Sequence, residues 1–173
     1  MSQKALESSG DNEWETPPEV FDHWNSRFNF DMDVAASDKI HKVGRYLTKA
    51  TSCLILDNKW GERNWMNPPY CKPEMPCKIP CTKKTCVKRG HCVDSYQPGL
   101  RDFVGEAAAQ AKLFGKLVVA LIPVATATEW WQTHVKQADH VFYYPNRINF
   151  LQNGTIVQGV AFDPCVVIWG LHP

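Results

Sequence analysis

The run 117–122 constrains the fold most, because six consecutive apolar residues leave no polar face. A strand of this kind is buried on both sides, which is typical of a parallel sheet covered by helices. Residues 101–115 precede it with apolar side chains at helical spacing and end in Gly115, a common helix stop. The sequence therefore predicts a helix leading into a buried central strand over 116–123.

Other patterns predict further strands and helices in alternation. Thr16-Pro17-Pro18-Glu19 fits a capping box with Pro17 at the first helical position, so we expect a helix to about residue 27. Alternating residues over 28–34 predict a strand that contains Asp33 near its end. The remaining expected elements are strands over 64–66, 140–144 and 164–169, a helix opened by Thr126-Ala127-Thr128-Glu129 that runs to about 138, and a turn at Asn153-Gly154. This alternation predicts an α/β fold with an open, mostly parallel sheet.

The length and composition fit one domain over 13–173, with a disordered polar lead over 1–12 and a basic, cysteine-rich insertion at about 71–98. No apolar stretch is long enough to span a membrane, so we expect a soluble, intracellular protein. The net charge is only +1, yet residues 71–92 hold six basic residues against one acid, Glu74, which gives +5 there and leaves −4 elsewhere. This asymmetry favours a nucleic-acid footprint, with solvated surface lysines as the alternative.

The stretch Asn67-Pro68-Pro69-Tyr70 carries the chemistry best suited to catalysis. The prolines fix the backbone and remove two donors, so the Pro68 carbonyl can face a cavity beside the side-chain carbonyl of Asn67. Two acceptors next to the Tyr70 ring would receive a flat molecule that bears an amino group. The alternative is a strand followed by an ordinary proline turn.

Four cysteines lie close together after this stretch: Cys77, Cys81, Cys86 and Cys92. Four thiols in a short basic loop suit a tetrahedral structural zinc, whose binding would supply the folding energy of a loop with little to bury. Cys71 and His91 are further candidate ligands, and reduced free cysteines are the alternative. Because Lys83 and Lys84 lie in this loop, we expect the loop to bind a nucleic-acid backbone, unless it is only a structural lid.

In this order and spacing the motifs resemble a phage-type DNA N-6-adenine methyltransferase, a Dam-like family that uses S-adenosylmethionine. The matching residues are Trp14-Glu15-Thr16-Pro17, Asp33-Val34-Ala35-Ala36-Ser37, Asn67-Pro68-Pro69-Tyr70, Leu121-Ile122-Pro123 with Thr126, Thr128 and Trp130, and Arg147-Ile148 with Phe150. The chain departs from the family pattern at Ala125 and Ala127, which replace Arg and Asp, and at Asn146, which replaces Gly.

The resemblance implies a small Rossmann-like methyltransferase fold and roles for single residues. Catalysis would rest on Asn67, Pro68, Pro69 and Tyr70, with the Tyr70 ring stacked on an adenine flipped out of double-stranded DNA. The methyl donor would contact Thr16, Pro17 and Asp33, and Asp57 is a further candidate for it. Thr126 and Arg147 would lie on the substrate side. Each has a plainer interpretation: Thr16, Asp33 and Thr126 as helix caps, Asp57 as a turn residue and Arg147 as a surface arginine.

Two other functions stay open from the sequence. The same motif occurs in methyltransferases that act on RNA adenine or protein glutamine, and Ala125 and Ala127 are compatible with a non-catalytic, zinc-dependent DNA-binding protein. The oligomeric state, the target site and the biological role are not encoded in any pattern described above.

Overall fold

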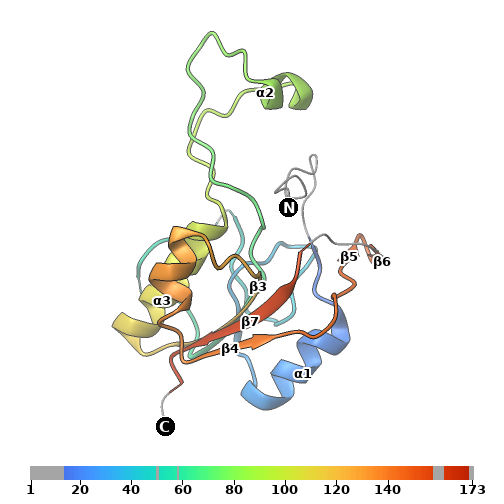
Figure 1. Ribbon diagram of the computed structural model, residues 1–173, viewed down its shortest axis with the longest axis vertical. Coiled ribbons are helices and arrows are strands. Elements are labelled where there is room, and N and C mark those ends of the chain that lie inside the picture. Colours follow the sequence, from blue (N-terminus) through green and yellow to red (C-terminus); the bar gives the residue numbers. More distant parts are fainter. Residues whose placement is uncertain (1–13, 50, 58, 158–161, 172–173) are drawn as a thin grey trace.

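Five strands form one sheet in the order β1-β2-β3-β7-β4 in the computed structural model of the chain (Figure 1). The structure describes residues 14–49, 51–57, 59–157 and 162–171, so the lead predicted over 1–12 lies outside the described residues. No helix among these residues is long and apolar enough to cross a membrane.

The first three strands are parallel and form the half of the sheet that carries the site. They are β1 (Met32–Asp33), β2 (Arg63–Met66) and β3 (Leu117–Pro123), and β2 pairs with the other two. The strands expected over 64–66 and 116–123 are confirmed. The strand expected over 28–34 is much shorter than predicted, because α1 (Pro18–Phe28) extends through Phe28 and Asn29 turns the chain with a φ of 51°.

The sheet is mostly parallel, as expected, because four of its five strands run in one direction and a single strand is reversed. Strand β7 (Pro164–Trp169) runs antiparallel to both β3 and β4 (His140–Tyr143). The described residues between β4 and β7, 144–157 and 162–163, contain no crossover helix and form a small hairpin of β5 (Leu151–Gln152) and β6 (Thr155–Ile156) with the expected turn at Asn153-Gly154. Without a helical crossover, the chain returns in the opposite direction.

Helices cover the sheet and complete the core. Helix α1 packs Phe21 edge-on against Trp65, with ring centroids 5.5 Å apart. Helix α3 (Leu100–Phe114) packs on β3 and ends at Gly115, whose φ of 65° suits glycine best. The helix expected after Thr126 is shorter than predicted and contains a π-helical turn, η2 (Trp131–Val135), so residue 138 lies beyond it.

Residues 72–98, called the arm from here on, project away from the sheet and carry α2 (Lys84–Arg89) at the far end (Figure 1). Two backbone hydrogen bonds between Glu74 and Gln97 pair its outgoing and returning segments. At the root, the Leu100 N–H donates to the Cys71 carbonyl over 2.8 Å. A side chain at Gly99 would meet the Pro73 nitrogen at 2.3 Å, so only glycine lets the two segments approach this closely.

Candidate active site and cysteine cluster

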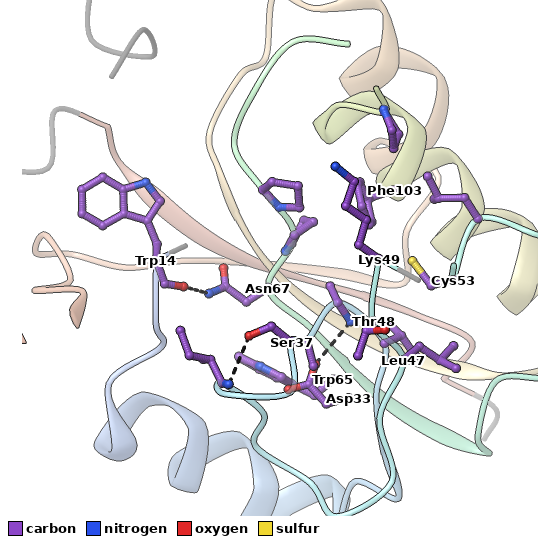
Figure 2. Close-up of a pocket in the computed structure, with 18 of the residues that line it drawn as sticks. Trp14, Asp33, Ser37, Leu47, Thr48, Lys49, Cys53, Trp65, Asn67 and Phe103 are labelled. Carbon is purple, nitrogen blue, oxygen red and sulfur yellow. Dashed lines mark hydrogen bonds between the residues drawn. The ribbon is translucent and has the colours of Figure 1, made fainter. Parts of the chain in front are cut away.

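Strands β1 and β2 end at the same edge of the sheet, where a cavity of about 350 Å³ opens (Figure 2). Asp33 ends β1, and Asn67 follows the last residue of β2. Both line the cavity, together with Thr16 from the segment before α1. The carboxyl edge of parallel strands is where open α/β sheets bind ligands, and this volume falls in the range of small-molecule sites.

Asn67 is held in one orientation by hydrogen bonds on both sides of its amide. Its Nδ2 donates to the Trp14 carbonyl over 2.6 Å, as Figure 2 shows, and its Oδ1 lies 2.7 Å from the Tyr70 hydroxyl. A carbonyl oxygen has two lone pairs, so Oδ1 can accept one further hydrogen bond. The Pro68 carbonyl has no donor among the described residues, although Pro68 and Pro69 both line the cavity. Asn67 and Pro68 therefore both lie at the cavity, and each has an oxygen that can accept a hydrogen bond.

Tyr70 does not offer a stacking face in this structure, which corrects the role expected for it. The residue is 3% exposed, lies in the hydrophobic core and is absent from the cavity wall. Its hydroxyl lies 2.9 Å from the Leu121 carbonyl as well as 2.7 Å from Asn67 Oδ1, so one proton serves two acceptors. Burial raises the pKa of Tyr70 well above its ordinary value, so the hydroxyl stays protonated and donates. The Tyr70 hydroxyl thus fixes the orientation of the Asn67 side chain from the core side.

Thr16 is not the helix cap that its sequence pattern suggests. Pro17 occupies the cap position of α1, no side chain caps the helix, and the capping box is wrong. The Thr16 side chain is 2% exposed, and its hydroxyl has no hydrogen-bond partner among the described residues. Because unpaired buried polar groups are costly, this hydroxyl on the cavity wall is available to a ligand or to water. Pro17 itself is buried outside the wall, and its carbonyl accepts from Val20 and Phe21.

Asp33 organises the loop that forms one wall of the cavity. Its carboxylate accepts hydrogen bonds from the backbone of Lys42 over 2.9 Å and of Ala35 over 3.3 Å. Burial raises the pKa of Asp33, while these two N–H groups oppose the rise. The helix-cap alternative is wrong, because no helix follows Asp33.

Three other predicted residues lie away from the cavity wall. The Asp57 carboxylate pairs with Lys59 over 2.9 Å at the surface, and the Asp57 carbonyl accepts from Gln110, which fits the turn interpretation. Thr126 and Arg147 are exposed. The structure therefore does not bring these three together with Asp33 and Asn67.

The sequence reasoning missed two tryptophans of the wall. Trp14, half-buried, lies beside Asn67 at the cavity, and Trp65 lies next to Asp33 (Figure 2). The Trp65 indole N–H is fully buried, and no described residue accepts from it. The position of Trp65 in a strand, two residues before Asn67, was a signal that it belongs to the site. The irregular segment 47–54, which also lines the cavity, gave no signal because it forms no regular element.

In the arm, the sulfur atoms of Cys77, Cys81, Cys86 and Cys92 lie within 4.8 Å of one another. The sulfurs of Cys77 and Cys86 are 3.4 Å apart. A hydrogen bond from the Val93 backbone lowers the pKa of the Cys77 thiol to about 7, whereas a hydrogen bond with Cys81 raises that of Cys92 to about 12. Cys71 and His91 are not in the cluster, so the four ligands predicted first are the four that the structure brings together.

Comparison with known proteins identifies the family of the chain. A family model for DNA N-6-adenine-methyltransferase (Dam) matches residues 3–168. The DNA N-6-adenine-methyltransferase of Haemophilus phage HP1 (strain HP1c1) is 31% identical over 159 residues, covering 90% of this chain and 75% of that protein. That of Escherichia phage T1 is 34% identical over 65 residues, covering 36% of this chain and 26% of that protein. No solved structure matches the chain. The chain belongs to the DNA N-6-adenine-methyltransferase (Dam) family.

Proposed function

We propose that the cavity binds S-adenosylmethionine and that the chain methylates the N6 amino group of adenines flipped out of double-stranded DNA. One observation carries the proposal: the acceptors of Asn67 and Pro68 share a cavity with the partnerless polar atoms of Thr16 and Trp65. Three parallel strands with the cavity at their carboxyl edge support a Rossmann-like methyltransferase architecture.

The wall fits a ligand that has both charged and hydrogen-bonding groups. The Asp33 carboxylate would attract an ammonium group, while the Thr16 hydroxyl and the Trp65 N–H would donate to oxygens. S-adenosylmethionine supplies an electrophilic methyl group on a sulfonium. Replacing Thr16 by Val keeps the shape and removes the hydroxyl. We expect this variant to bind S-adenosylmethionine about 2- to 10-fold more weakly in calorimetry, the value of one hydrogen bond. Unchanged affinity would show that the Thr16 hydroxyl does not bind S-adenosylmethionine.

Asn67 and Pro68 would prepare the adenine nitrogen for attack. The lone pair of that nitrogen is delocalised into the ring, which makes it a poor nucleophile. Accepting one hydrogen at Asn67 Oδ1 and the other at the Pro68 carbonyl favours a pyramidal nitrogen with a localised lone pair. An amide is no general base, so these residues act by alignment and preorganised electrostatics, and the proton leaves to water after transfer.

Trp14 takes the stacking role that the buried Tyr70 cannot fill. Its carbonyl accepts from Asn67, so its backbone lies directly beside the acceptor pair, and its ring is only half-buried. The ring also meets Phe150 edge-on, with centroids 6.2 Å apart, which holds it in place. Stacking on an aromatic ring is worth about 1–3 kcal/mol per base and offsets part of the cost of flipping.

The cysteine cluster is the second cofactor site, for structural zinc. Zinc–sulfur bonds of about 2.3 Å in a tetrahedron place sulfurs about 3.8 Å apart. The 3.4 Å pair and the 4.8 Å limit for all four bracket that value. Only Cys86 and Val93 are buried in the arm, so little apolar packing holds it, and metal binding would supply the missing stability.

Elemental analysis of the purified protein tests the metal site. We expect one zinc per chain, lost in Cys77→Ser but retained in Cys71→Ser, since the Cys71 thiol faces the Pro98 carbonyl instead of the cluster. Cobalt substitution should give thiolate-to-cobalt absorption in the wild type and in Cys71→Ser only. A zinc-free protein that binds no cobalt would overturn the metal assignment.

Labelled methyl transfer tests the main proposal. Duplex DNA, RNA and glutamine-containing protein are offered in parallel, and modified positions are mapped. We expect N6-methyladenine in duplex DNA alone. Transfer to RNA or to protein would show that the substrate is not restricted to duplex DNA and would contradict the proposed specificity. Failure to bind S-adenosylmethionine would favour a DNA-binding protein without catalysis.

A further inference from the structure

The arm presents a row of cations that the protein itself does not neutralise. Lys72, Lys78, Lys83, Lys84 and Lys88 are all exposed, and none forms an ion pair with a described residue. Arg89 differs, because its guanidinium forms an ion pair with Glu74 at 3.1 Å and so links α2 to the segment of the arm that contains Glu74. The lysines are therefore the arm's available charges, and Arg89 is a structural residue.

The arm is not packed as a lid on the body. Ile79 is 88% exposed, and Val87 on α2 is also exposed. A lid would bury such side chains against the cavity rim. Figure 1 shows α2 held away from the sheet at the far end of the arm.

The root of the arm is nevertheless part of the cavity. Cys71, Gln97 and Pro98 line it, and Gln97 accepts a hydrogen bond from Lys49 over 2.9 Å on the facing wall. Cys77 lies six positions after Cys71, so the cluster lies at most about 20 Å along the chain from the cavity wall. At about 3.4 Å per base pair, this reach corresponds to roughly six base pairs, or half a turn of DNA.

We propose that the arm is a second DNA-binding site, which grips the phosphates of the flanking duplex about half a turn to one side of the target base. The inference rests on the proposed function, because the position of the target base defines the flank. Lysines that contact phosphates position a duplex without reading its sequence. Substrates should accordingly need duplex on one side of the target and not on the other.

Binding to duplexes trimmed on one side tests the proposal. The target adenine is placed about 4 base pairs from one end and about 14 from the other, and then the reverse, lengths that bracket the arm's reach. We expect the wild type to bind one of the two duplexes markedly more tightly. Lys83→Gln/Lys84→Gln should bind more weakly and with a clearly smaller difference between the two duplexes, and its slope of log affinity against log salt should fall by about 1.8.

Lys112→Gln/Lys136→Gln is the matched control, since it removes the same charge from exposed positions outside the arm. Lys112 lies in the last turn of α3, which leads to the opposite edge of the sheet. This variant should retain the preference for one duplex. Equal binding of both duplexes by the wild type, or an unchanged preference in Lys83→Gln/Lys84→Gln, would overturn the proposal.

Two further measurements distinguish failure of the arm proposal from misfolding of the variant and from failure of the proposed function. Calorimetry with S-adenosylmethionine should give the same affinity in Lys83→Gln/Lys84→Gln as in the wild type, which shows an intact body. Methyl transfer is assayed on the same two duplexes. Transfer without any flank dependence would sink the arm proposal alone, whereas one-sided binding without transfer would sink the proposed function alone.

Discussion

The cavity and the arm are held in shape by different interactions. Around the cavity, β3 is fully buried from Val118 onward, and Asn67 is fixed by bonds to Trp14 and Tyr70. Position there follows from core packing. In the arm, few side chains are buried, and four sulfurs converge at one point instead. The proposed reaction, which needs close alignment, would take place in the packed region, and the proposed contact with phosphates, which needs only charge and reach, would be made by the arm.

Asn67→Ala should give the largest effect, because it removes an acceptor at the reacting nitrogen. We expect methyl transfer to fall by at least about 100-fold, the scale for losing one preorganised polar group in an active site. The affinity for S-adenosylmethionine, measured by calorimetry, should stay within about 2-fold. Full activity in this variant would contradict the assignment of the cavity.

Trp14→Ala should come next, since stacking is worth about 1–3 kcal/mol per base. We expect DNA carrying the target adenine to bind about 5- to 100-fold more weakly, with binding of S-adenosylmethionine little changed. Fluorescence of 2-aminopurine at the target position reports flipping directly. An unchanged fluorescence signal would show that a ring other than that of Trp14 stacks on the base.

Tyr70→Phe should have a smaller effect that falls on kcat. The ring and its packing against Phe150 and Phe162 remain, while the donor to Asn67 Oδ1 is lost. We expect kcat to drop about 3- to 10-fold, as one hydrogen bond allows, with KM for DNA nearly constant. A loss confined to KM would instead indicate that Tyr70 contacts the base.

Cys77→Ser/Cys86→Ser should have the smallest effect on the body, and this tests the contrast between the two regions most directly. Since the sheet and the cavity do not depend on the cluster, the affinity for S-adenosylmethionine should stay within about 2-fold. Amide exchange should become faster in 72–98 and stay unchanged in β3 and β7. Faster exchange throughout the sheet would show that the two regions share their stability.

The sequence predicted the parts of the fold that depend on local pattern. Strands β3 and β7 are apolar runs, and Gly115 ends α3 as expected. The reversed direction of β7 was not predictable in this way, because it depends on which neighbour the strand meets. The same holds for Tyr70, which is buried against Phe150 and Phe162 and whose hydroxyl donates to the carbonyl of Leu121, 51 residues away.

The site was predicted where residues follow strand ends and missed where irregular chain forms the wall. Asp33 and Asn67 were found because parallel strands bring their carboxyl ends together. Thr16 was found only through the resemblance to a family, since the local pattern favoured a cap. Trp65 was missed although its position two residues before Asn67 was a signal, and the segment 47–54 was missed because its side chains reach the cavity only after the tertiary fold has formed.

The hydrogen bond between Leu100 and Cys71 closes the base of the arm, so the chain leaves and re-enters the body at nearly the same point. A short turn across that gap could carry the chain from β2 to α3 with 72–98 removed and the sheet undisturbed. The arm is therefore a self-contained insertion between β2 and α3, and its length is not constrained by the position of Asn67.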